Sequence, residues 1–423
     1  MSIKKKVAAC ACAVTMALSL ASCGDTSYVM KTDKYTVSAG MYLDYMLEEL
    51  NTQMQTLYYK GITSDYLEQK YSDTQTVGQH LSEFAYDKCV EAIVINKKFD
   101  EMGLSLTDEE LSKINDNLSS VWESYSKYYE SNGISKASLK EILNTSAKSY
   151  SIFRAYYYDG GLEEVTTEDI NDYLSDNYIR FKLLTIEKDT SDPSSTKAEE
   201  LAKKYAEMAK VSSLDEVIEE YQEFMKKQTE ESLKNDASGS GTPSDDSSTV
   251  TTASSDSSQP DSTTDTSSDA QVTTTDSSSQ PEVTTNQEVT TVASPSPSSA
   301  TGDTTTAEKE DPYKNEACIN KNSDSYKDNE VIKYVDEKMS FDTISTYSDD
   351  KNWYVIEKLD ILKREDYAKD NHDSLLSEMK SDAFAELLDE WEKELDIEVN
   401  TKAIDRYTPE TVYKKMVDAN SSK

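Results

Sequence analysis

The sequence is poor in the residues on which most catalytic and metal sites depend. Its 423 residues include 2 His, 5 Cys and 11 Gly. We find no Gly-x-Ser-x-Gly, His-Glu-x-x-His, phosphate-loop or dinucleotide-loop pattern, and the Cys and His residues are too few for a zinc site. His80 and His372 both fall on expected helices, where we interpret each as an ordinary surface or edge residue. The sequence therefore predicts no catalytic residue, no metal site and no cofactor.

Positive charge is also scarce. Lys and Arg number 44 against 81 Asp and Glu, so the formal net charge is −37. Such a surface repels phosphate groups, which disfavours nucleic acid and anionic lipid head groups as partners. With so many acids, the spacing of any two carboxylates gives no evidence for calcium binding or for general acid–base catalysis.

The N-terminus has the pattern of an export signal. Lys4, Lys5 and Lys6 precede an uncharged, mostly apolar stretch over residues 7–20, which is too short to span a bilayer as a helix. The run Leu20-Ala21-Ser22-Cys23 then resembles the lipobox of bacterial lipoproteins, in which the Cys receives a diacylglyceryl group and becomes the first mature residue. We therefore expect Cys23 to be lipidated and the protein to be anchored at the extracytoplasmic face of a bacterial membrane. The alternative is a plain signal peptide.

Removal of residues 1–22 takes away three lysines and no acids, so Lys and Arg fall from 44 to 41 and the mature net charge becomes 41 − 81 = −40. Cys89 and Cys318 would then be the remaining thiols. Cys89 lies on an apolar helix face, so we interpret it as a small core residue. A disulfide between the two stays open, because one sequence cannot establish the geometry that it needs. Two free thiols are the preferred interpretation.

Residues 236–311 form a block of Ser, Thr and Asp with scattered Pro. No aromatic residue occurs between Phe224 and Tyr313. A segment of this kind buries too little apolar surface to offset its chain entropy, so we predict a disordered acidic spacer. O-glycosylation of its hydroxyls is an open alternative.

The rest of the chain has mainly helical periodicity. Short strands are expected within 28–38, and the first and last parts of the chain otherwise favour helices. The apolar run at 178–187 and the one at 353–361 favour strands. The expected helices cover 41–50, 77–102, 108–125, 135–157, 166–177, 197–210, 213–227, 329–338, 365–395 and 409–417, with a brief strand at 397–399.

This order of elements resembles the PrsA/SurA-type foldase lipoproteins, which carry a parvulin-like prolyl isomerase domain. The resemblance rests on the lipobox, the strand-to-helix entry at 35–50, the runs 103–111 and 133–135, and the run 164–173 that leads into the strand at 178–187. It implies a mainly α fold with a small α+β domain, in which a split helical chaperone lobe surrounds a degenerate parvulin-like insert that contains a long disordered loop. The predicted domains are a signal peptide (1–22), an N-terminal lobe (23–176), the insert (177–235 and 312–362) with its spacer (236–311), and a C-terminal segment that completes the lobe (363–423).

Two departures from that family bear on activity. The strand at 178–187 lacks the family's His, and the Gly-Gly-x-Leu-Gly loop is absent. We therefore expect an anchored chaperone or foldase that assists newly exported polypeptides without isomerase catalysis. The alternatives are an active peptidyl-prolyl isomerase, a ligand-binding lipoprotein of a transport system, and a spacer that joins two independent domains. The oligomeric state and the clients are not predicted.

Tyrosine is abundant, with 28 Tyr against 7 Phe. Adjacent tyrosines put rings on more than one face of a helix, so some rings must be exposed. A Tyr ring has an apolar body and a polar edge, which suits transient contact with unfolded chains. The candidate client-binding residues are Tyr58, Tyr59, Tyr128, Tyr129, Tyr156, Tyr157 and Tyr158, although for any single one a core position is the simpler interpretation.

Overall fold

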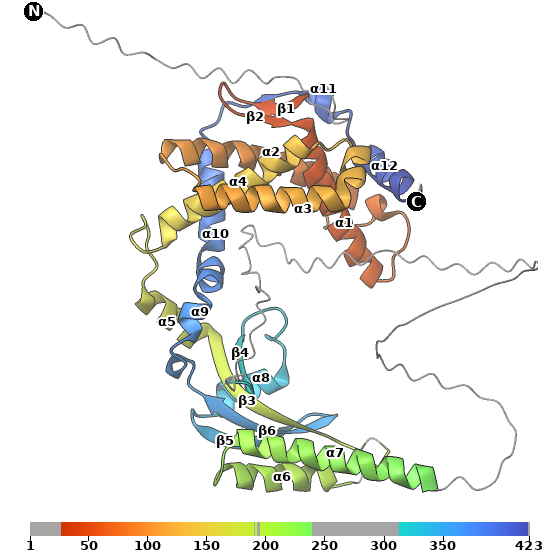
Figure 1. Cartoon of the computed structure of the whole chain (residues 1–423), viewed down its shortest axis with the longest axis vertical. Coiled ribbons are helices and arrows are strands. Elements are labelled where there is room, and N and C mark those ends of the chain that lie inside the picture. The colour runs from red at the N-terminus through yellow and green to blue at the C-terminus, as the bar shows by residue number, and fades with distance from the viewer. Residues whose placement is uncertain (1–26, 190, 193–194, 239–312, 422–423) are drawn as a thin grey trace, which may run out of the picture. The chain divides into compact units, whose positions relative to one another are not determined.

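The computed structural model describes residues 27–189, 191–192, 195–238 and 313–421 (Figure 1). The chain divides into two compact units. Unit 1 holds the described residues of Met1–Tyr173 and Arg364–Lys423, and unit 2 holds those between, from Leu174 to Lys363. Both units combine helices with a small antiparallel sheet, as the sequence predicted.

Unit 1 draws its elements from both ends of the chain. They are β1 (Tyr28–Lys31), β2 (Thr36–Ser38), α1 (Ala39–Tyr59), η1 (Tyr66–Glu68), α2 (Val77–Glu101), α3 (Asp108–Asn132) and α4 (Lys136–Tyr157), followed by α9 (Tyr367–Asp370), α10 (His372–Glu392), β7 (Glu398–Val399), α11 (Thr401–Ile404) and α12 (Pro409–Ser421). Helix α5 (Thr167–Asn177) spans the division between the units.

The long helices begin and end where the local sequence satisfies their free backbone groups. Thr76 and Gln79 form a capping box at the start of α2, and Thr107 and Glu110 form another at the start of α3. Helix α3 ends at Gly133, whose φ of 86° lies in the left-handed region that a side chain disfavours. These signals explain why the sequence predicted the start of each helix closely.

The core of unit 1 lies between α1 and α2 and extends to α4. Leu50, Leu81 and Cys89 are each 0% exposed there. The apolar residues of α3 differ in burial: Ile114 and Leu118 are buried, whereas Leu111 is 40% and Tyr125 is 47% exposed. Helix α3 packs against α4 and α12 but leaves its opposite face in solvent, so its apolar stripe is narrower than its sequence indicates.

The C-terminal segment completes unit 1. Strand β1 pairs with β2 on one edge and with β7 on the other, both antiparallel. Helix α10 packs on α2 and α4, and α12 packs on α1, α2 and α3. Unit 1 therefore depends on contacts between residues that lie more than 300 positions apart, such as the hydrogen bond from the Tyr28 hydroxyl to Glu398, with a sequence separation of 370.

Unit 2 is built around a four-stranded antiparallel sheet in the order β4-β3-β6-β5. Its elements are β3 (Tyr178–Glu187), α6 (Lys197–Ala209), α7 (Leu214–Ser238), β4 (Glu316–Asn320), α8 (Glu330–Lys338), β5 (Thr343–Ser348), β6 (Asn352–Leu359) and η2 (Ile361–Lys363). Figure 1 shows α6 and α7 along this sheet.

Both faces of the central strand β3 are covered. Leu184 and Ile186 pack against α6 and α7, whereas Ile179 and Phe181 pack with Ile332 and other residues of the α8 side. Alternate residues of a strand point to opposite faces. Covering on both faces explains why the strand has buried apolar residues on each of its faces instead of on one face alone.

Several boundaries differ from the expectations. The helix expected at 365–395 is divided at Asn371 into α9 and α10, and strands β4 and β5 were not predicted. Helix α7 continues to Ser238, three residues into the predicted spacer. The rest of that spacer, the predicted signal peptide and Cys23 lie outside the described residues. Within the described residues, no helix is both long and apolar enough to cross a membrane.

Candidate functional site

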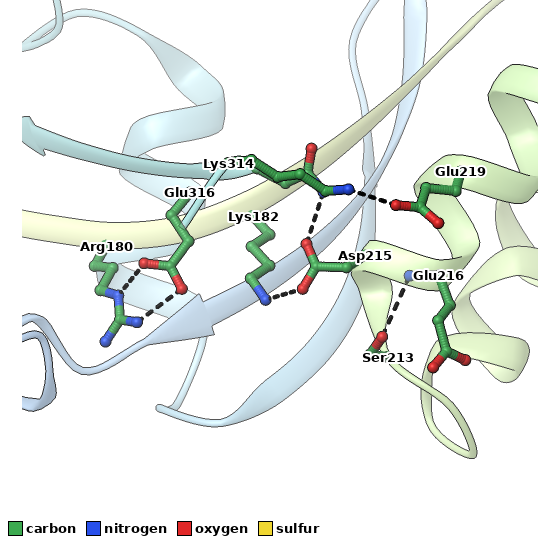
Figure 2. Close-up of polar contacts among 9 residues, drawn as sticks. Arg180, Lys182, Ser213, Asp215, Glu216, Glu219, Lys314 and Glu316 are labelled. Atoms are coloured by element: carbon green, nitrogen blue, oxygen red, sulfur yellow. Dashed lines mark hydrogen bonds and ion pairs between the residues drawn. The ribbon is translucent and has the colours of Figure 1, made fainter. Parts of the chain in front are cut away.

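The structure has two candidate sites. One is formed by the polar side chains of β3 in unit 2, and the other by the tyrosines of unit 1. On β3, Arg180 and Lys182 lie on the face that is turned toward the start of α7 (Figure 2). Alternation along the strand puts both side chains on the same face. This is the strand on which the sequence analysis found no His.

Arg180 is held by β4. Its Nε and Nη2 donate hydrogen bonds of 2.7 Å each to the two carboxylate oxygens of Glu316 (Figure 2). Its Nη1 donates to the carbonyl oxygen of Asp360 at 3.0 Å. The side chains of the pair are 10% and 3% exposed. This buried bidentate ion pair fixes the position of β4 on β3. Both carboxylate oxygens of Glu316 have a hydrogen-bond partner.

Lys182 is held by α7. Its Nζ forms an ion pair with Asp215, which also accepts a hydrogen bond of 2.7 Å from the Asn315 side chain (Figure 2). Burial by itself would raise the pKa of Asp215, but the bonds from Lys182 and Asn315 outweigh it and hold that pKa below its ordinary value. Asp215 is therefore charged at neutral pH and is a poor proton acceptor.

Two further contacts complete the polar surface. The hydroxyl of Ser213 accepts a hydrogen bond of 3.2 Å from the backbone N–H of Glu216 and so caps the start of α7, and Lys314 pairs with Glu219 (Figure 2). The charged groups of this surface are thus engaged with one another, an arrangement that stabilises the unit. It presents no nucleophile with an adjacent base.

Two other titratable side chains of unit 2 have shifted pKa values that could not be predicted from the sequence. Glu357 lies directly across from Lys182, and burial raises its pKa against the opposing effect of Lys182. Lys358, which is 7% exposed, donates to the carbonyl oxygens of Asp336 and Met339 at 2.9 and 3.1 Å, and burial lowers its pKa. Lys358 therefore satisfies free carbonyls at the end of α8, which is a structural role.

The two histidines differ from each other. His80 lies at the edge of the core, with a side chain that is 15% exposed: its Nε2 lies 2.8 Å from Oε1 of the 5%-exposed Glu49, and the Tyr71 ring stacks on its ring at 3.6 Å. His372 begins α10 and keeps more solvent contact, with Nδ1 3.3 Å from Asp373. In the described ranges no cluster of three His, Cys, Asp or Glu residues is arranged to hold a metal ion.

Within the described residues, neither Cys89 nor Cys318 forms a disulfide. Cys89 is fully enclosed in the core of unit 1, and this burial raises its pKa, so it is the small core residue that the sequence indicated. Cys318 lies on β4 directly across from Arg180.

The seven tyrosines proposed for client binding occupy different environments. Tyr58 and Tyr59, at the end of α1, are 64% and 79% exposed. Tyr128 and Tyr129 are half-buried against the core, and the Tyr128 hydroxyl accepts a hydrogen bond of 3.2 Å from Asn51. Of the seven proposed tyrosines, Tyr58 and Tyr59 are therefore the two whose rings are exposed enough to contact a client.

Near the end of α4, Tyr157 is 0% exposed, so it is removed from the predicted binding surface. Tyr157 is buried because α10 covers the face of α4 on which it lies. The centroid of its ring is 6.5 Å from that of the Phe384 ring on α10. Tyr156 packs on Trp391, and Tyr158 shares a hydrogen bond of 2.9 Å with Tyr150. Among the described residues, four tyrosines outside the proposed set also have exposed rings: Tyr71, Tyr86, Tyr125 and Tyr326.

Comparisons with known proteins add one structural neighbour. No protein-family model and no curated protein matches the chain. The crystal structure of PrsA from Bacillus subtilis is similar to it with 15% sequence identity and a TM-score of 0.24, over 80% of this chain and 96% of that one. At this identity and TM-score the likeness does not establish a common fold, so the proposals below rest on the chain's own residues.

Proposed function

We propose that this protein is a lipid-anchored chaperone or foldase at the extracytoplasmic face of a bacterial membrane, where it holds newly exported polypeptides without catalysing prolyl isomerisation. The observation that carries the proposal is the exposure of Tyr58 and Tyr59, 64% and 79%, at the end of a helix whose first half is largely buried in the core of unit 1. Rings at such a position can contact an unfolded chain at no cost in core packing.

The chaperone lobe, in this proposal, is unit 1, with its N-terminal helices completed by α10 and α12. The anchor would be Cys23, which lies outside the described residues. The lipobox and the preceding apolar stretch of the sequence support it.

The absence of catalysis is proposed from β3 and its neighbours. Rotation about the bond before proline has a barrier of roughly 20 kcal/mol, so an isomerase must hold its substrate in a prepared polar cleft. In unit 2 the polar groups of β3 are already engaged: Arg180 with Glu316, and Lys182 with Asp215.

Residues 24–423 should be tested side by side for suppression of aggregation and for acceleration of prolyl isomerisation. We expect an unfolded client to aggregate more slowly and a Xaa-Pro peptide to isomerise at the uncatalysed rate. The double variant Tyr58→Ser/Tyr59→Ser should suppress aggregation less well, whereas Tyr125→Ser on α3 serves as the matched control. A chain that leaves aggregation unchanged at molar excess would refute the chaperone proposal. Isomerase activity that disappears in Lys182→Ala would refute the absence of catalysis.

A further inference from the structure

A pocket of about 500 Å³ lies in unit 1, where α2 faces the turn between α11 and α12. Its lining includes three tyrosines and two acids, which are Tyr42, Tyr86, Tyr407, Glu83 and Asp405. This volume lies in the range of pockets that bind small molecules or single side chains. None of these residues belongs to the client-binding set that the sequence predicted.

One of the lining residues, Tyr42, has a hydroxyl without a hydrogen-bond partner. Tyr42 is 1% exposed, and its hydroxyl forms no hydrogen bond with any other residue that the structure describes. Burial raises the pKa of Tyr42 to about 12, so the hydroxyl stays neutral and can accept a hydrogen bond from a ligand.

The residues that line the pocket include two carboxylates, Glu83 and Asp405, and no Lys or Arg. Glu83 accepts a hydrogen bond from the neutral side chain of Gln75, and the Asp405 carboxylate has no ion-pair partner among the described residues. Asp87 lies one turn along α2 from Glu83. Its pKa is raised by burial and by the nearby charge of Glu83. Additional negative charge is therefore unfavourable here, and a cation is attracted.

The aromatic walls fit the same kind of ligand. Tyr86 is 37% exposed, and no cation of the described residues lies over its ring. The Tyr407 ring is 7% exposed and already has Lys415 at 5.4 Å and Arg406 at 5.9 Å, so it acts as a fixed apolar wall. An open aromatic face beside two carboxylates is the arrangement that attracts an ammonium or guanidinium group with an aliphatic stem.

We propose that this pocket binds the side chain of a lysine or arginine in an extended polypeptide. The carboxylates of Glu83 and Asp405 would attract the cation, the Tyr86 ring would cover its stem, and the Tyr42 hydroxyl would accept a hydrogen bond from it. The inference rests on the proposed function, because it names the part of an unfolded client that unit 1 would hold. Clients rich in basic residues would then be preferred by a chain with a net charge of −37.

The test uses the full chain in detergent micelles and two pentapeptides, acetyl-Gly-Gly-Lys-Gly-Gly-amide and its norleucine counterpart, with binding measured by calorimetry and by NMR. We expect saturable binding of the lysine peptide that weakens as salt is raised, and binding of the norleucine peptide at least tenfold weaker. Equal binding of the two peptides, or binding that is insensitive to salt, would overturn the proposal.

Variants localise the effect. Glu83→Gln/Asp405→Asn should lower the affinity for the lysine peptide at least tenfold, and Tyr42→Phe should lower it a few-fold while the ring stays in place. The matched control Glu123→Gln/Glu130→Gln, which removes the same charge from exposed positions on α3, should bind like the unmodified chain. If the control loses as much affinity as the pocket variant, net charge and not the pocket is responsible, and the site is wrong. If the double pocket variant does not fold, the affinity of Tyr42→Phe for the lysine peptide and the salt dependence of that binding in the unmodified chain still test the proposal.

The experiment separates this inference from the proposed function. If the protein suppresses aggregation but binds the lysine and norleucine peptides equally, the chaperone proposal stands and the pocket proposal is wrong. If it binds the lysine peptide preferentially but leaves aggregation unchanged, the pocket proposal stands and the chaperone proposal is wrong.

Discussion

The ring of Phe384 on α10 meets the ring of Phe153 on α4 edge to face, with 5.4 Å between ring centroids and an interplanar angle of 84°. The two residues are 2% and 0% exposed. This contact, with the nearby Tyr157, is where the C-terminal segment enters the core of unit 1. The structure shows that α10 packs on both α2 and α4.

Phe384→Ala should lower the free energy of unfolding by about 3–5 kcal/mol, because it removes a fully buried ring and leaves a cavity. Trp391→Ala should cost less, about 1–2 kcal/mol, since Trp391 is only partly buried and its ring contacts Tyr156 and Lys98 at the edge of the core. Urea unfolding of the two variants measures the difference. A larger loss for Trp391→Ala than for Phe384→Ala would contradict this account.

Glu316→Ala should destabilise unit 2 by about 3–5 kcal/mol, because it leaves the Arg180 guanidinium buried without its counter-charge. Thermal unfolding gives the loss, and amide hydrogen exchange along β3 shows whether it is confined to this sheet. The control is Glu219→Ala, whose partner Lys314 is 46% exposed. We expect about 0–1 kcal/mol there. Similar losses for the two variants would mean that burial does not govern the strength of these pairs.

Asp44 on α1 should make unit 1 less stable as the pH rises. Burial, with a smaller contribution from Glu48, raises its pKa from 3.8 to about 8. The folded state therefore holds a proton that the unfolded chain has already lost, and stability falls as the pH rises from about 4 through about 8.

Asp44→Asn removes this dependence. We expect the variant to match the unmodified chain near pH 4 and to exceed its stability at pH 9, on the order of 1–3 kcal/mol because the side chain keeps some solvent contact. Urea unfolding at the two pH values measures it, with Glu130→Gln on α3 as control. An advantage for Asp44→Asn that is the same at both pH values would rule out this titration as its cause.

Cys23→Ala should release the protein from the membrane fraction, because the lipid on Cys23 is the proposed anchor. Two acyl chains are enough for stable attachment, and a chain without them has only weak reversible binding. Cell fractionation with immunoblotting measures the distribution, and Cys89→Ala is the matched control. A Cys23→Ala variant that stays with the membranes would show that another part of the chain anchors it.

The sequence predicted the helices of unit 1 because their start signals are local. Thr107 and Glu110 are three residues apart, so their capping box can be recognised in the sequence alone. Strands β4 and β5 were missed because their residues are short runs of intermediate burial with no clear alternation. Their pairing depends on β3 and β6, which are distant in sequence.

The polar sites could not be predicted for a similar reason. Arg180 and Glu316 are 136 positions apart, and nothing near either residue identifies the other. The contact of His80 with Glu49 could not be predicted, because Glu49 lies 31 positions earlier on another helix. The pocket at Tyr42 needs residues from α1, α2 and the α11–α12 turn, so only the folded chain brings its carboxylates and hydroxyl together.

The pairing of β1 with β7 has a consequence for the order in which the protein can fold. Met30 lies across from Val399, and the Asn400 side chain donates a hydrogen bond to the carbonyl oxygen of Tyr28. A chain made from its N-terminus therefore cannot complete its first sheet until almost its last residues have been synthesised. Contacts between such distant residues form slowly, since closing the intervening loop costs entropy before any contact is gained. Until then α1 and α2 lack the cover that α10 and α12 provide, so the faces that meet those two helices stay exposed until the C-terminal segment has been made.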